Sequence, residues 1–205
     1  MDNNTKNHQT EKDILASAKH IFHIKGLSGA RMQEIADVAG INKAMLHYYF
    51  RSKDKLFEAV FRDAVKNFFP KIFELINTDQ PLFSKIENFV SGYIQIILEN
   101  PCVPGFIINE LSQNPQRIKN IFIENEIAPP EKFIHQIIKA IEDKEIIPIN
   151  PKELMLNIIS LCLFPVVAKP IVETALNLTE ENYNALIESR KKEVAKFIIN
   201  AIKLK

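Results

Sequence analysis

The hydrophobic positions of this chain recur at the three- and four-residue spacing of amphipathic helices, without the alternation of strands. The stretch from Glu11 to Lys25 carries one such stripe, and Gly26 follows where a helix commonly ends. A second stripe begins after Lys53 and runs to about Ile76. The two stripes consist of Ile14, Ala18, Ile21 and Phe22, and of Leu56, Val60, Ala64 and Phe68. This pattern predicts an all-α fold with a long helix that Pro70 is placed to kink.

Asparagine, threonine and proline mark where further helices begin. An Asn-Pro pair combines a capping side chain with a residue that needs no donated N–H at the first helical position. The indicated starts lie at Pro81, Pro101, Pro115, Pro129-Pro130, Pro151 and Thr179. We therefore expect about six or seven helices after residue 80 and no sheet. The polar stretch from Met1 to Thr10 is expected to be a frayed arm.

The stretch from Arg31 to Lys55 predicts a helix, a tight turn and a second helix. Its first helix carries an apolar stripe that ends at Ala39, and Gly40 follows where a left-handed residue is needed. Asn42 is placed to cap the second helix, and Leu46 is expected to pack inward. That leaves a row of outward-facing side chains, which a packed core does not require.

The outward-facing side chains suit DNA. Lys43 seeks phosphate, His47 and Tyr49 are donors that reach backbone oxygens, and small or apolar side chains between them can meet base edges. Lys53 at a helix start capped by Ser52 also indicates a phosphate nearby. The expected DNA-binding residues are Gln33, Asn42, Lys43, Ala44, Met45, His47, Tyr48, Tyr49 and Lys53. A solvated helical hairpin is the alternative, but three consecutive rings at positions 48–50 argue against it.

The run IADVAGINKAMLHYYFRSKDKLF closely resembles the TetR/AcrR repressors, and the resemblance spans Ile14 to Phe61. It implies an all-α regulator with an N-terminal three-helix DNA-binding domain. A long helix would join this domain to a C-terminal helical bundle that binds a ligand and dimerises. Two positions depart from the family pattern: His47 stands where a phosphate-contacting Tyr is usual, and Ala30 where a capping Thr or Ser is common. Ser28 could replace that cap.

The resemblance places the domain boundary in the long helix. Residues 1–52 form the expected helix-turn-helix domain, with the start of the long helix to about residue 66, and residues 53–205 form the effector and dimerisation domain. The expected function is that of a repressor that binds a palindromic operator as a homodimer and is released by a small apolar effector. The alternative is a helical protein-interaction module that does not bind DNA.

Charge is informative only locally. The 205 residues have a net charge of +1, so attraction to nucleic acid cannot come from the bulk field. Residues 1–66 hold eleven Lys and Arg against eight Asp and Glu, and four of the five His. With 46% hydrophobic and 25% charged residues the chain is globular and not disordered.

The sequence indicates no enzyme, cofactor or metal site. No Ser or Cys nucleophile has a base nearby, no Gly-rich phosphate loop occurs, and the chain has only five glycines. Cys102 and Cys162 lack metal or redox spacing and are interpreted as core thiols. No apolar run reaches the roughly 18 residues of a membrane span, and the N-terminus is not a signal peptide. A cytoplasmic protein without a membrane partner is expected.

Two further surfaces are predicted in the C-terminal domain. An effector pocket is expected among Phe-rich helices that carry isolated polar groups, although a dry core fits the same pattern. Its proposed lining is Phe73, Phe89, Tyr93, Phe106, Asn109, Glu110, Phe133, His135 and Ile137. A homodimer is expected from the last two helical segments, because the stretch from Ile158 to Leu176 has almost no polar face. The predicted interface residues are Ile158, Leu161, Val166, Leu186, Val194, Phe197 and Ile198.

Overall fold

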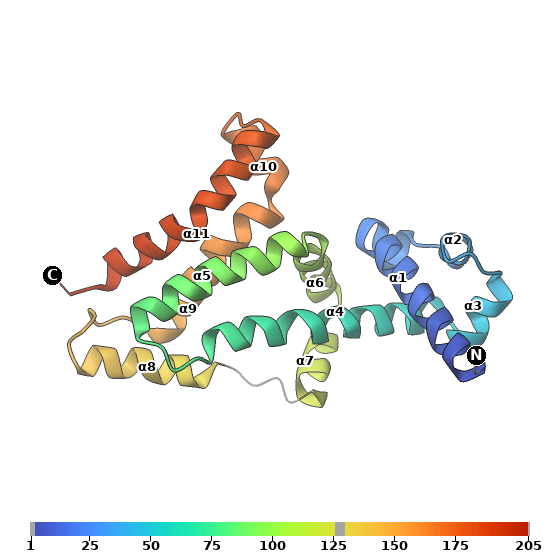
Figure 1. Ribbon diagram of the computed structural model, residues 1–205, viewed down its shortest axis with the longest axis horizontal. Helices are drawn as coiled ribbons and strands as arrows, with labels where there is room; N and C mark the ends of the chain where they lie inside the picture. Colours follow the sequence, from blue (N-terminus) through green and yellow to red (C-terminus); the bar gives the residue numbers. More distant parts are fainter. Residues whose placement is uncertain (1–2, 126–129, 205) are drawn as a thin grey trace. The chain divides into compact units, whose positions relative to one another are not determined.

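A computed structural model describes residues 3–125 and 130–204, and within these ranges the chain is all-α, as predicted. The helices are α1 (Asn3–Gly29), α2 (Met32–Val38), α3 (Lys43–Tyr49), α4 (Lys53–Ile76), α5 (Leu82–Glu99), α6 (Cys102–Gln113), α7 (Pro115–Glu124), α8 (Glu131–Glu142), α9 (Pro151–Val167), α10 (Lys169–Ala175) and α11 (Glu180–Ile202). Figure 1 shows this order along the chain. The described part of the chain contains one isolated antiparallel bridge, between Ile146 and Lys203.

The chain folds as two compact units. The first unit comprises residues 1–67 and 105–121, and the second comprises residues 68–104 and 122–205. The helix α4 therefore contributes residues to both units. The boundary predicted at residues 52 and 53 did not anticipate that residues 105–121, from α6 and α7, belong with the N-terminal helices.

Aromatic rings hold the first unit together. Phe22 of α1 meets Phe57 of α4 edge-on, with ring centroids 5.0 Å apart. Phe106 of α6 contacts Phe57 and Phe61 at 5.4 and 5.6 Å. All four side chains are buried, so each removes a large apolar area from water. The two predicted apolar stripes are thus confirmed as core, since every one of their eight residues is buried.

An ion pair between a buried Glu and a half-buried Arg joins α6 and α7 in the same unit. A guanidinium nitrogen of Arg117 lies 3.1 Å from a carboxylate oxygen of Glu110, and the guanidinium also covers the ring of Phe57 at 5.2 Å. Burial raises the pKa of Glu110, and the positive charge of Arg117 opposes this shift. Glu110 is therefore engaged inside the first unit.

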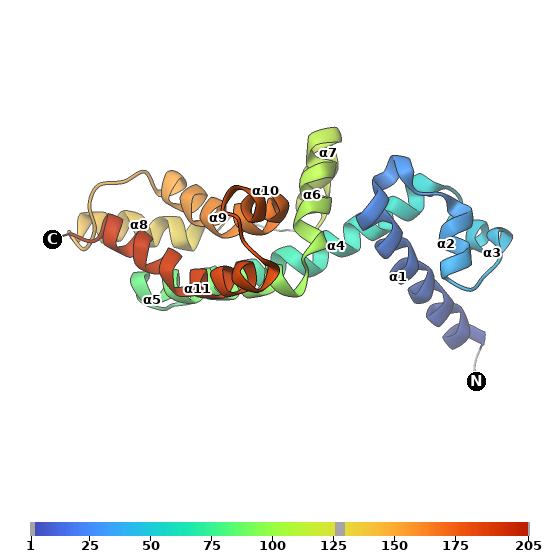
Figure 2. The ribbon, with the colours of Figure 1, turned by 90° about the horizontal axis from the view of Figure 1, so that it is seen from above.

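In the second unit, α5 packs against α8, α9 and α11. Figure 2 shows these helices running beside one another. Gly92 of α5 permits close packing, because a Cβ atom there would lie 2.8 Å from the side chain of Leu75. The buried face of α5 follows helical spacing and includes Ile86, Phe89, Tyr93 and Ile97.

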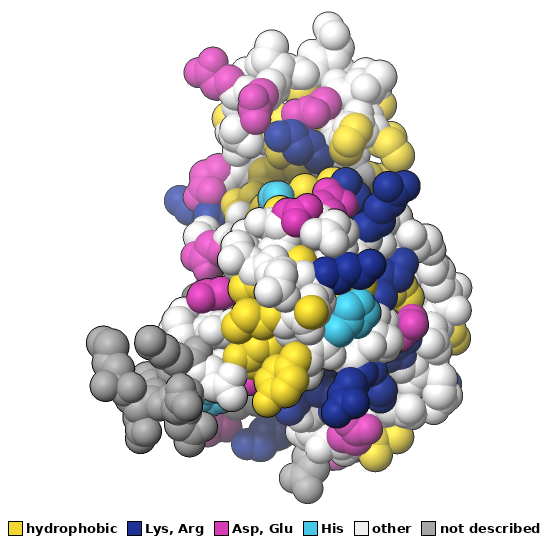
Figure 3. Space-filling model, turned by 90° about the vertical axis from the view of Figure 1, so that its right-hand side faces the viewer, with side chains coloured by type: hydrophobic (Ala, Val, Ile, Leu, Met, Phe, Trp, Pro, Cys, Tyr) yellow, Lys and Arg dark blue, Asp and Glu magenta, His cyan; other side chains and the backbone are white. Residues whose placement is uncertain are grey.

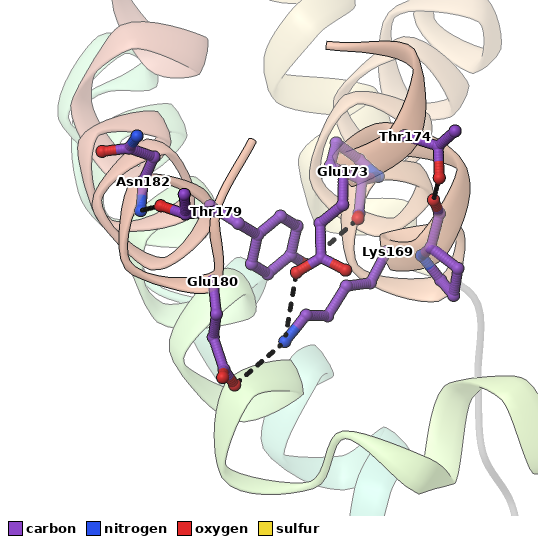
Figure 4. A network of polar contacts seen from close by, with 9 residues as sticks. Lys169, Glu173, Thr174, Thr179, Glu180 and Asn182 are labelled. Carbon is purple, nitrogen blue, oxygen red and sulfur yellow. Dashed lines mark hydrogen bonds and ion pairs between the residues drawn. The ribbon is translucent and has the colours of Figure 1, made fainter. Parts of the chain in front are cut away.

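Polar contacts fix the α9–α10–α11 corner. The hydroxyl of Tyr183 donates to the carbonyl oxygen of Pro165 at 3.2 Å, and Arg190 donates to that of Leu161 at 2.6 Å. Figure 4 shows the ammonium of Lys169 between the carboxylates of Glu173 and Glu180, each 3.6 Å away. The same ammonium lies over the Tyr183 ring at 4.8 Å. These contacts hold α9 and α11 side by side.

Several sequence predictions are corrected by the structure. The helix α1 begins at Asn3, so residues 3–10 are helical and not frayed, while residues 1–2 lie outside the described ranges. The helix bends at Gly26 (φ +63°), where it was expected to end. Cys102 is exposed and is not a core thiol, although Cys162 is buried as expected. The long apolar segment is broken at Ala168 between α9 and α10.

Among the described residues, no single helix is long and apolar enough to cross a membrane. The pair α9 and α10 meets the length and composition only when taken together, and the two helices are bent by 80°.

Candidate nucleic-acid interface

The turn between α2 and α3 has the geometry that the sequence predicts. Gly40 has φ +67°, a conformation that a residue with a Cβ adopts only with strain. The amide of Ile41 donates to the carbonyl oxygen of Ala36 at 3.0 Å, which closes the turn. The side chain of Asn42 accepts a hydrogen bond from the Met45 amide at 2.7 Å and so caps α3. Leu46 is fully buried and fixes α3 against its neighbours.

The opposite side of α3 faces solvent. Lys43 and His47 lie one helical turn apart, and so do Ala44 and Tyr48. All four side chains are exposed, and Tyr48 is 74% exposed. Figure 3 shows Lys and Arg side chains gathered around a histidine on this face of the first unit. Met45, 37% exposed, extends the surface with an apolar side chain. The helix thus offers a cation, a ring donor, an aromatic ring and small apolar groups together.

Some predicted DNA contacts already have partners within the protein. The Lys53 ammonium donates to the carbonyl oxygens of Ala30 and Ser28, at 3.2 and 3.5 Å. Gln33 donates to Asp37 at 2.8 Å. The Tyr49 hydroxyl donates to the side-chain oxygen of Asn7. These three side chains therefore connect parts of the first unit, whatever they contribute to DNA.

Two features of this region were missed by sequence reasoning. Asn7 reaches α3 although 42 positions separate it from Tyr49, and no local pattern signals such a contact. Arg51 is exposed directly after α3, and its carbonyl oxygen lies 3.4 Å from Nδ1 of His47. The cap of α2 also differs from expectation, because Arg31 occupies that position without a side-chain hydrogen bond and Ser28 does not replace it.

The predicted effector residues do not assemble into one site within either unit. Phe106, Asn109 and Glu110 belong to the first unit, and the other six belong to the second. Within the second unit, Phe89, Tyr93, Phe133 and Ile137 are buried, Phe73 is half-buried and His135 is exposed. The rings of Phe89 and Tyr93 stack with centroids 5.5 Å apart.

The predicted dimer residues divide into a core side and an outer side. Ile158, Val194 and Ile198 are buried within their own unit. Leu161, Val166 and Leu186 are half-buried, and Phe197 is 66% exposed. Other large apolar side chains of α9 face solvent, namely Leu156 (56% exposed), Phe164 (60%) and Val167 (38%).

Comparison with known proteins finds a family match for the N-terminal part of the chain. Residues 14–60 match the family described as "Bacterial regulatory proteins, tetR family". The chain is 37% identical over 60 residues to the transcriptional repressor NicS of Pseudomonas putida, covering 29% of this chain and 28% of NicS. It is 44% identical over 52 residues to the transcriptional regulator RutR of Escherichia coli, covering 25% of this chain and 24% of RutR. The matched stretch thus spans about a quarter of the length of these two relatives.

The similarity of fold extends over nearly the whole chain. The ketosteroid transcriptional regulator KstR2 of Mycobacterium tuberculosis superimposes with a TM-score of 0.68 at 15% identity, covering 95% of each chain. The family match covers residues 14–60, whereas the similarity of fold covers 95% of the chain. Residues 14–60 are therefore similar to the tetR family of bacterial regulatory proteins, and the fold is similar to that of KstR2.

Proposed function

We propose that this chain binds operator DNA through the exposed face of α3 and regulates transcription in response to a ligand. The observation that carries the proposal is the orientation of α3, whose Leu46 is fully buried while Lys43, His47 and Tyr48 are exposed. A short helix held in this way can enter a major groove with its first residues toward the bases. NicS is named a transcriptional repressor, which supports repression as the mode of action.

Some of these side chains would position the protein on the DNA backbone, and others would contact the bases and so recognise the sequence. Lys43 supplies a charge for a phosphate, and His47 supplies a second donor for the DNA backbone. Ala44 and Met45 are small or apolar enough to meet a thymine methyl, and the exposed Tyr48 ring can lie against bases. The net charge of +1 makes these local groups decisive, since the whole-protein field adds little.

A homodimer is part of this proposal. The exposed Phe164 and Val167 of α9, with Phe197 of α11, leave apolar area in water that a second copy of the chain would cover. Paired α9 and α11 helices from two copies would form a four-helix interface around a two-fold axis. That symmetry suits a palindromic operator with half-sites about one turn of DNA apart or somewhat more.

The effector site is proposed in the second unit, among the buried rings of Phe89, Tyr93 and Phe133. These side chains are mostly apolar, so a pocket that opened among them would favour a small apolar effector. Because α4 contributes residues to both units, a ligand that changed the packing of α4 in the second unit would also affect the part of α4 on which the first unit packs. A cytoplasmic location is part of the same proposal, since the operator would be there.

The test of DNA binding starts from genome fragments selected by the purified protein, followed by affinity measurements at several salt concentrations. Lys43→Ala should weaken binding to all sequences and reduce the slope of log affinity against log salt by about one. Tyr48→Ala should change the sequence preference. Lys66→Ala, an exposed lysine on α4, is the control and should leave both unchanged.

The alternative function is a helical interaction module whose exposed tyrosine and lysine contact a protein. Selection of no DNA fragment above background, or equal affinity of the wild type and the Lys43→Ala and Tyr48→Ala variants for the selected fragment, would support that alternative.

A further inference from the structure

The first unit contains a cavity of about 380 Å³ that the proposed function does not use. It lies between the bent end of α1, from Phe22 to Ser28, and the part of α6 from Gly105 to Gln113. Its volume falls within the range of small-molecule pockets. The α1 side of the cavity leads directly to α2 of the helix-turn-helix.

Two glycines keep this cavity open. Gly26 has φ +63°, and this conformation bends α1. A Cβ atom at position 26 would lie 3.9 Å from the amide nitrogen of Asn109, and glycine leaves that space free. Gly105 is within α6, and a Cβ there would meet no atom within 4 Å. A larger side chain at position 105 would therefore extend into open space and not into the protein core.

The lining combines an aromatic surface with unused hydrogen-bonding groups. The rings of His23 and Phe106 lie 4.7 Å apart, centroid to centroid. Nε2 of His23 is buried without a hydrogen-bond partner. The amide nitrogen of Gln113 donates to the side-chain oxygen of Asn109 at 3.3 Å, which leaves the Asn109 amide nitrogen and the Gln113 amide oxygen available.

The cavity presents no uncompensated charge. Lys25 is the one formally charged residue in its lining, and its ammonium is bonded to the carboxylate of Glu34. His23 is neutral at pH 7, because burial lowers its pKa to about 4, with a smaller contribution from Lys19 and His20. A charged ligand would lose hydration without gaining an opposite charge.

We propose that this cavity binds a small neutral molecule that combines an aromatic ring with a carboxamide or similar group that both donates and accepts hydrogen bonds. The ring packs against Phe106 and His23. The polar group bonds to the side chains of Asn109 and Gln113. This site is separate from the effector site proposed in the second unit, and its occupancy is measurable whether or not the protein binds DNA.

Benzamide is a suitable probe, with benzoate and benzamidinium as charged analogues of similar shape. Titration followed by protein NMR should show saturable binding of benzamide, with shifts confined to residues that line the cavity. The two charged analogues should bind at least about tenfold more weakly, because neither finds a counter-ion there. Equal binding of all three compounds would overturn the assignment to neutral ligands.

Gly105→Leu is the decisive variant. It replaces a helical glycine whose side-chain direction is open, so the fold should be retained, while the leucine occupies the cavity and should weaken benzamide binding by about tenfold or more. Ser112→Leu adds a leucine to the exposed surface of α6 away from the lining and should leave binding unchanged.

Asn109→Leu provides a second variant that does not depend on packing at position 105. It removes a polar group from the cavity and should also weaken binding. Unaltered benzamide affinity in both Gly105→Leu and Asn109→Leu, or no saturable binding to the wild type, would overturn the proposal.

Discussion

The hydroxyl of Tyr49 at the end of α3 donates a hydrogen bond to the side-chain oxygen of Asn7 near the start of α1. The Tyr49 ring also meets the Tyr48 ring edge-on, with centroids 5.5 Å apart. Tyr49 therefore joins the N-terminal turns of α1 to the exposed tyrosine of α3. The sequence predicts that Tyr49 contacts phosphate directly, and the structure gives it a second role in positioning α3 against α1.

Tyr49→Phe and Asn7→Ala test this positioning role together. If the hydroxyl acts through Asn7, each change should weaken operator binding by about threefold to tenfold, since one hydrogen bond contributes on the order of 1 kcal/mol. The double variant should then lose no more than either single variant. An effect of Tyr49→Phe with none of Asn7→Ala would instead assign the hydroxyl to DNA. His8→Ala, an exposed neighbour, is the matched control for Asn7.

Lys53 supports a second prediction. Its ammonium is directed at the carbonyl oxygens of Ser28 and Ala30, which lie in the segment before α2. Lys53→Met keeps the apolar stem and removes the charge, and it should lower the free energy of unfolding by about 1 kcal/mol, because the site is partly exposed. Chemical denaturation measures this loss.

DNA binding of the same variant decides whether Lys53 also contacts phosphate. We expect the salt dependence of operator binding to change less than in Lys43→Ala. If the slope of log affinity against log salt decreased by about one and the free energy of unfolding were unchanged, the result would support the phosphate contact that the sequence predicts for Lys53.

The local features of the fold could be read from the sequence, because each depends on neighbouring residues. Gly40 adopts the left-handed conformation, Asn42 caps α3, and Ser52 accepts from the Lys55 amide at the start of α4. The helices α7 and α9 begin at the prolines of their Asn-Pro pairs. Such signals involve at most a few positions along the chain.

The missed features depend on contacts between distant segments. Residues 105–121 join the first unit through Phe106, whose partners Phe57 and Phe61 are more than 40 positions away. Composition could not show that Glu110 pairs with Arg117 instead of facing an effector. Helical periodicity places a residue on a face, but it does not identify the helix that this face meets.

The two cysteines should differ in reactivity. Burial raises the pKa of the Cys162 thiol to about 12, so it is protonated at pH 8, whereas Cys102 is exposed. An alkylating reagent at pH 8 should modify one thiol per native chain, since the thiolate is the reactive form. Mass spectrometry identifies the site, and Cys102→Ser should abolish the rapid reaction. Rapid labelling of Cys162 in the native protein would contradict its position in the core.

Phe197 tests the proposed dimer. It is 66% exposed on α11, and Phe197→Glu would place a carboxylate in the interface, where burial without a partner is unfavourable. Sedimentation at micromolar concentration should show a dimer for the wild type and a shift to monomer for the variant. Asn184→Glu adds the same charge at another exposed position of α11 and should remain dimeric. A monomeric wild type would refute the dimer itself.

His23 gives the protein a predictable dependence on acid. Its pKa in the folded state is lowered from 6.5 to about 4, mainly by burial and further by Lys19 and His20. Between these two pH values the unfolded chain binds a proton that the folded chain does not, so the free energy of unfolding falls as the pH drops through this window. Because the ring is only half-buried, we expect a loss of about 1 to 2 kcal/mol.

In His23→Gln this part of the pH dependence should disappear, whereas His8→Gln, exposed on the same helix, should follow the wild type. Urea denaturation at pH 7 and pH 4.5 measures the difference, and identical pH dependence in wild type and His23→Gln would show that the histidine is not protected from protonation.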